Sequence, residues 1–169
     1  MSGFYRGSPS MSRVDDTGAG PARRAQLRHW RSFLQAHAHL VRRLEADLLA
    51  DGHPPLAMYD VLVQLVEAPG RRLRMTELAD AVLLSRSGLS RLISRMQTQG
   101  YVVREPSPGD ARGVYAVATD AGVAALRAAS RTHLSGVSAY VIDRLSPDEL
   151  AAFGAVCSKL LPEAQVKLS

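Results

Sequence analysis

The stretch from Leu83 to Gly113 constrains this chain more than any other, because it combines a helix pattern with a dense set of arginines and serines. Apolar residues recur in it at intervals of three and four, the spacing of a buried helix face; they are Leu89, Leu92, Ile93 and Met96. The opposite face holds hydroxyls and arginines and no acidic residue. The pattern predicts an amphipathic helix that is capped by Ser85, ends at Gly100 and presents a basic outward face.

This outward face predicts contact with DNA. Surface helices commonly carry glutamate and lysine that pair along the helix, whereas short hydroxyls allow close approach to base edges and arginine binds guanine through two hydrogen bonds. The candidate contacts are Arg86, Ser87, Ser90, Arg91, Ser94 and Arg95. A short helix before this one, with Thr76 as the expected cap, supplies the first half of a helix-turn-helix. A merely solvated polar face is the alternative.

Two β-rich segments, YVVRE and GVYAVAT, follow the helix and predict a two-stranded hairpin. The connection between them, EPSPGDARG, is nine residues long, whereas about two to five would suffice. Arg112 lies near its tip, and Asp110 comes two residues earlier. We expect Arg112 to enter the minor groove and Asp110 to hold its guanidinium. A flexible turn with an incidental Asp110/Arg112 pair is the alternative.

The rest of the chain predicts a mainly α fold of about six helices, in which the hairpin is a small wing beside the helix-turn-helix. A first helix is expected from Gln26 to Leu49, a fifth from Thr119 to about Leu145, and a last one from the capping box at Ser146. The expected organisation is a disordered tail (1–24), a helical dimerisation region (25–56 and 119–169) and a winged helix-turn-helix (57–118).

Charge and composition agree with a nucleic-acid partner. The net charge is +5 and the pI is near 9.9, and residues 71–112 hold eight arginines against four acidic residues. No apolar run approaches the roughly 18 residues of a membrane helix, and the N-terminus lacks the apolar core of a secretory signal. We therefore expect a cytoplasmic protein without a membrane partner.

The sequence favours no catalytic site, cofactor or metal, and we expect a protein that is not an enzyme. No catalytic triad, carboxylate pair or phosphate loop rises above chance. His37 and His39 point about 200° apart on a helix, and no two histidines have the four-residue spacing of helical metal sites. The single cysteine, Cys157, cannot form a disulfide within the chain.

The terminal helices carry more apolar surface than a winged domain can bury, so a partner must cover them. A symmetric homodimer would do so, and it would place two recognition helices about one turn of DNA apart on a pseudopalindromic operator.

The run from Met75 to Gly122 resembles the winged helix-turn-helix of the MarR family of bacterial transcriptional regulators. LSRSGLSRLISRM is similar to its recognition helix, GYVVRE to its first wing strand, DARG to its wing tip, and VYAVATDAG to its returning strand and next helix. One departure is Ala118, where the family commonly has leucine. The resemblance implies that Arg91 and Arg112 are the motif arginines of helix and wing, and that the dimer is built from the terminal helices.

The resemblance also implies control of a repressor by a small, often aromatic and anionic effector bound between the dimer helices and the winged domain. Trp30, His37 and Met58 are the candidate pocket residues, because an aromatic ring, a titratable donor and a thioether suit a mostly apolar pocket. Ordinary core or dimer contacts are the alternative for all three. For the protein as a whole, the alternatives are DNA binding without an effector and a helical adaptor that has lost DNA binding.

Overall fold

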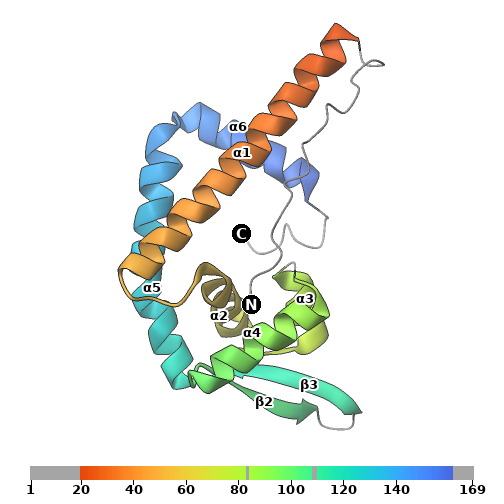
Figure 1. Ribbon diagram of the computed structural model, residues 1–169, viewed down its shortest axis with the longest axis vertical. Coiled ribbons are helices and arrows are strands. Elements are labelled where there is room, and N and C mark those ends of the chain that lie inside the picture. The colour runs from red at the N-terminus through yellow and green to blue at the C-terminus, as the bar shows by residue number, and fades with distance from the viewer. Residues whose placement is uncertain (1–19, 83, 108–109, 162–169) are drawn as a thin grey trace, which may run out of the picture. The chain divides into compact units, whose positions relative to one another are not determined.

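The computed structural model describes residues 20–82, 84–107 and 110–161, and the side chains at positions 21, 22 and 110–112 lie outside that description. Its elements are α1 (Pro21–Ala50), α2 (Leu56–Glu67), β1 (Arg72–Arg74), α3 (Met75–Ala81), α4 (Arg86–Thr98), β2 (Val102–Ser107), β3 (Asp110–Ala118), α5 (Asp120–Tyr140) and α6 (Pro147–Leu160) (Figure 1). The predicted mainly α fold with a small β wing is confirmed. The chain divides into two compact units, residues 1–39 and 40–169, and the boundary between them falls within α1.

The helix-turn-helix rests on a core within the second unit. Side chains from α2, α3, α4 and the sheet are fully buried there, among them Leu62, Leu65, Leu78, Leu89, Ile93, Met96 and Val102. Burial of each large aliphatic side chain stabilises the fold by about 1.5 to 3 kcal/mol. The apolar stripe predicted for α4 is thus confirmed as buried, and its burial turns the serines and arginines outward.

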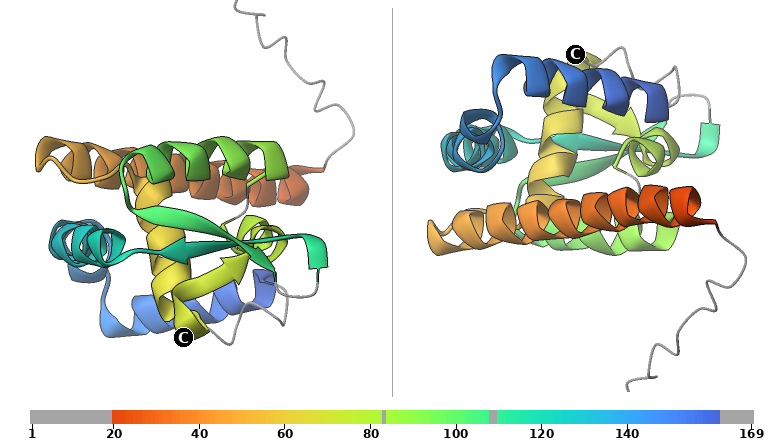
Figure 2. Two further views of the ribbon diagram at one scale, coloured as in Figure 1. Left: turned by 90° about the horizontal axis from the view of Figure 1, so that it is seen from below. Right: turned by 90° about the horizontal axis from the view of Figure 1, so that it is seen from above.

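The wing is a three-stranded antiparallel sheet in the order β1-β3-β2. Figure 2 shows its two long strands beside α4. The hairpin was predicted but β1 was not, because three residues carry no readable alternation and their partner strand lies some forty positions away. In the sheet, Arg72 pairs with Val117 and Arg74 with Tyr115.

The wing strands are longer than expected, so the prediction of a nine-residue connection is wrong. Strand β2 continues to Ser107 and β3 begins at Asp110, with an irregular register between Pro106 and Ser107. Proline is tolerated in β2 because this strand lies at the edge of the sheet, where its missing N–H need not pair.

Several helix ends follow the predicted capping. Ser85 Oγ accepts from Gly88 N at 3.1 Å, Thr119 Oγ1 from Gly122 N at 3.0 Å, and Ser146 Oγ from Glu149 N at 3.3 Å. In the capping box of α6, the Glu149 carboxylate in turn accepts from Ser146 N at 2.9 Å. Hydrogen bonding to the backbone of Ser146, and secondly to its side chain, lowers the pKa of Glu149.

Three other helix ends differ from the predictions. Helix α1 begins at Pro21 rather than Gln26, because proline suits the first helical position and the next residues are helix formers; residues 1–19 of the predicted tail lie outside the described residues. Helix α3 begins at Met75, and Arg74 N donates to Glu77 Oε2 at 3.0 Å, so Thr76 is not its cap. Helix α5 ends at Tyr140, before the 3₁₀ turn η2 (Ile142–Arg144), where β-branched residues disfavour the helix.

Candidate nucleic-acid interface

The outward face of α4 carries all six predicted recognition-helix residues. The side chains of Arg86, Ser87, Ser90, Arg91, Ser94 and Arg95 are exposed. The N-cap at Ser85 fixes where the helix begins, and its buried stripe fixes which side is turned outward. The face presents guanidinium and hydroxyl groups and no carboxylate, which suits a polyanionic partner.

Two hydroxyls of this helix hydrogen-bond to the helix backbone. Ser94 Oγ donates to the carbonyl oxygen of Ser90 at 3.0 Å, and Thr98 Oγ1 donates to that of Ser94 at 3.2 Å. Each hydroxyl has thereby used its hydrogen, and its oxygen lone pairs are still able to accept.

Arg104 was not among the predicted site residues, yet it reaches from β2 to the recognition helix. Its Nη2 donates to the carbonyl oxygen of Ser90 at 3.0 Å and to Ser94 Oγ at 3.2 Å. In β2, Val102 is buried, Val103 exposed and Arg104 half-buried. The alternation of strand side chains, which places Arg104 on the same face as Val102, was the signal that could have revealed it.

Arg74 connects the short strand β1 with the far end of β2. Its Nη2 donates to Ser107 Oγ at 3.2 Å and its Nε to Tyr115 Oη at 3.3 Å. The guanidinium of Arg72 lies 5.1 Å from the centre of the Tyr115 ring, a cation–π contact. Ser107 is 6% exposed, so the wing is held near its end by a partly buried hydrogen bond.

A hollow of about 560 Å³ lies between α3, α4 and the wing. Among the described residues, its lining includes Arg74, Arg86 and Arg104, together with Thr76 and Ser90, and no acidic residue. A second hollow along α4 is lined by Gly88, Ser90, Arg91, Ser94 and Arg95. Arginines thus line both depressions on this side of the helix-turn-helix.

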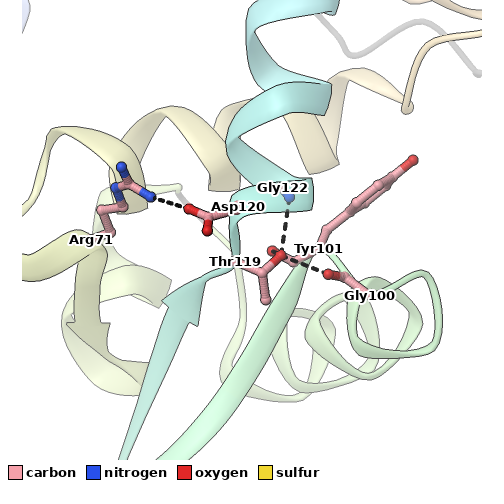
Figure 3. A network of polar contacts seen from close by, with 6 residues as sticks. All are labelled: Arg71, Gly100, Tyr101, Thr119, Asp120 and Gly122. Atoms are coloured by element: carbon pink, nitrogen blue, oxygen red, sulfur yellow. Dashed lines mark hydrogen bonds and ion pairs between the residues drawn. The ribbon is translucent and has the colours of Figure 1, made fainter.

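The end of α4 is joined to the start of α5 by a compact set of contacts (Figure 3). The single hydrogen of Thr119 Oγ1 is shared between the carbonyl oxygens of Gly100, at 2.6 Å, and Tyr101, at 3.1 Å. A Cβ atom on Gly122 would lie 2.2 Å from Tyr101 O, so only glycine fits there. Arg71 pairs with Asp120 at 2.8 Å across an exposed surface, which contributes under about 1 kcal/mol.

The predicted wing-tip residues fall partly outside the description. Asp110 and Arg112 belong to β3, but their side chains lie outside the described residues. The expected Asp110/Arg112 pair and the minor-groove role of Arg112 therefore stay predictions.

The candidate pocket residues lie in different surroundings. Met58 is 2% exposed and belongs to the core of the second unit. Trp30 and His37 belong to the first unit; Trp30 is 53% exposed and stacks on Phe33, with ring centres 5.6 Å apart. An effector site formed by these three residues therefore stays a prediction.

The described ranges of the chain contain no group of three or more histidine, cysteine or carboxylate side chains able to hold a metal ion. None of the helices in those ranges is long and apolar enough to cross a membrane.

A helix-turn-helix followed by a β wing defines a winged-helix protein, and comparison with known proteins identifies the family. The model of the MarR family matches residues 55–113. The structure is similar to that of Sco3205, a MarR family transcriptional regulator from Streptomyces coelicolor solved in complex with DNA: identity is 39%, the match covers 83% of this chain and 93% of that one, and the TM-score is 0.74.

AbsC, another MarR family transcriptional regulator from S. coelicolor, is 34% identical, with 80% of this chain and 91% of that one covered and a TM-score of 0.75. An uncharacterised HTH-type transcriptional regulator from Bacillus cereus is 29% identical over 111 residues, which are 66% of this chain and 72% of the relative. The chain belongs to the MarR family of transcriptional regulators, and the resemblance noted in the sequence is confirmed.

Proposed function

We propose that this protein is a homodimeric, sequence-specific DNA-binding regulator that represses a neighbouring gene or its own. The observation that carries the proposal is the outward face of α4, where exposed arginines and serines stand without a carboxylate on a helix held by a buried core. Sco3205, which is similar over most of its length, was solved in complex with DNA. The protein would act in the cytoplasm and would not be an enzyme.

In the proposed complex, α4 lies in the major groove. Arg91 contacts base edges, and the other arginines of α4 contact bases or phosphates. The wing lies beside it, with Arg112 in the minor groove, where a narrow groove has a strongly negative potential. The hydrogen bond between Arg74 and Ser107 supports this arrangement, because it stiffens the strand that leads to the wing tip.

A second copy of the chain is the proposed cover for the apolar side chains that remain exposed on the terminal helices. Helix α1 exposes Leu27, Trp30, Phe33 and Leu34, and α6 exposes Phe153, Val156 and Leu160. Contiguous apolar patches on a free monomer are unfavourable in water, and a symmetric contact buries them in pairs. The same symmetry gives the operator its two half-sites.

Control by a small-molecule effector completes the proposed function. We propose a small phenolic or aromatic acid as the effector, with Trp30, His37 and Met58 as its candidate contacts; Met58 is buried in the core of the second unit. Salicylate and related acids are the probes, and the fluorescence of Trp30, the only tryptophan, reports binding. An effector that releases DNA must perturb emission and weaken operator binding over the same concentration range.

Selection from random DNA pools tests the central proposal. The full chain should enrich a pseudopalindrome of about 16 to 20 base pairs, with an affinity that falls steeply as salt rises. A helical adaptor would enrich no site, and an effector-free regulator would enrich one that no phenolic acid weakens. Elution as an 18.2 kDa monomer would contradict the dimer.

A further inference from the structure

We propose that Arg104 determines DNA specificity indirectly, by holding Ser94 of the recognition helix as a hydrogen-bond acceptor, so that each half-site carries adenine or cytosine at the base that faces Ser94. The inference rests on the proposed DNA-binding function and adds to it a residue on the wing that acts through another side chain.

The hydrogen bonds around Ser94 define its orientation. Its hydroxyl hydrogen goes to the carbonyl oxygen of Ser90, at 3.0 Å, and its oxygen accepts from Arg104 Nη2 at 3.2 Å. The same Nη2 lies 3.0 Å from Ser90 O and 3.5 Å from Ser90 Oγ. A hydroxyl has one hydrogen and two lone pairs, so one lone pair of Ser94 is left for a partner outside the protein.

That remaining lone pair selects for a donor. In the major groove, the amino groups of adenine and cytosine donate, whereas the edges of guanine and the O4 atom of thymine accept. A serine without such contacts can pair with a donor or with an acceptor on a base, because its hydroxyl rotates. The hydroxyl hydrogen of Ser94 is committed to Ser90, and the charged Arg104 guanidinium fixes the orientation of the hydroxyl. Ser94 therefore pairs with base donors and not with base acceptors.

The sheet fixes the place of Arg104. Its backbone pairs with Ala116 of the central strand β3, and Ala116 is fully buried. The guanidinium therefore approaches α4 from a strand held in the core, and the contact spans two elements that must keep their relative position in the groove. An arginine acting only as an independent phosphate contact would not need these serine partners.

The test compares the full-length wild type with Arg104→Gln, Ser94→Ala and the double variant in selections from random DNA pools. Arg131→Gln, which removes an exposed charge on α5, is the matched control for net charge. We expect the wild type and the control to prefer adenine or cytosine at one position per half-site. Arg104→Gln and Ser94→Ala should both lose that preference, with affinity for the wild-type site lowered about fivefold or more.

Because both substitutions remove the same contact, the double variant should bind the wild-type site no more weakly than the weaker single variant. The salt dependence of Arg104→Gln should equal that of the control. If the slope of log affinity against log salt concentration were smaller by about one while the base preference was kept, Arg104 would be a phosphate contact instead, and the proposal would be overturned. The proposal would also be overturned if the two single variants lost base preference at different positions of the half-site.

The outcomes separate this inference from the proposed function. A wild type that enriches no site refutes both, whereas a wild type that enriches a site kept by Arg104→Gln refutes only the role of Arg104. Ser94→Ala removes one exposed hydroxyl from a helix and preserves the fold, so it tests the acceptor even if Arg104→Gln is unstable. In the DNA-free protein, amide exchange in α4 should be faster in Arg104→Gln than in the control, and equal exchange would contradict the contact.

Discussion

Replacing Gly122 with alanine is expected to destabilise the protein, because the new Cβ atom would lie 2.2 Å from the carbonyl oxygen of Tyr101 and 3.1 Å from Cδ2 of Leu62. The oxygen belongs to the backbone and cannot rotate away, so α5 and the start of β2 must move apart. This movement would strain the hydrogen bonds from Thr119 to Gly100 and Tyr101 (Figure 3).

The size of the effect follows from three contributions. Overpacking costs about 1 to 3 kcal/mol, and each weakened hydrogen bond costs about 1 kcal/mol. Alanine offsets about 1 kcal/mol of this through its higher helix propensity. The free energy of unfolding should therefore fall by about 2 to 4 kcal/mol.

Urea unfolding at a fixed protein concentration measures this free energy, and Gly154→Ala is the matched control. Gly154 lies on α6, and no atom of the described residues lies within 4 Å of a new Cβ there, so alanine should stabilise the protein by up to about 1 kcal/mol. A Gly122→Ala variant as stable as the control would refute the steric reasoning.

Three further predictions concern DNA contacts, pH and capping. Arg91→Ala should cost about 1 to 3 kcal/mol of binding and relax one base preference per half-site, whereas Arg112→Ala should chiefly change the preference for A/T-rich flanks; equal binding by both variants and the wild type in gel-shift titrations would contradict the groove assignment. Burial lowers the pKa of His133, whose buried Nδ1 has no hydrogen-bond partner among the described residues. The unfolded chain therefore takes up the proton first, and stability should fall as the pH drops below about 6.5; His133→Gln should show a smaller loss in urea titrations between about pH 7.5 and 5.5, and an identical loss would contradict this cause. Ser85→Ala removes the cap of α4 and should lower the free energy of unfolding by about 1 kcal/mol, which unchanged urea midpoints would disprove.

Local sequence determined the parts of the fold that depend on neighbouring residues. The caps at Ser85, Thr119 and Ser146 were predictable because each accepts from an N–H three residues later. The buried stripe of α4 followed from helical periodicity alone, and with it the outward face that carries the candidate DNA contacts.

Only the tertiary structure decided the contacts between residues far apart in the chain. Arg104 meets Ser94 ten residues away, Arg74 meets Ser107 thirty-three away, and β1 is a strand only because β3 pairs with it. The close approach of Gly122 to Tyr101 is of the same kind. Periodicity and capping reveal which way a side chain points within its own element, but its partner depends on the register of the sheet and on how the core sets one element against another.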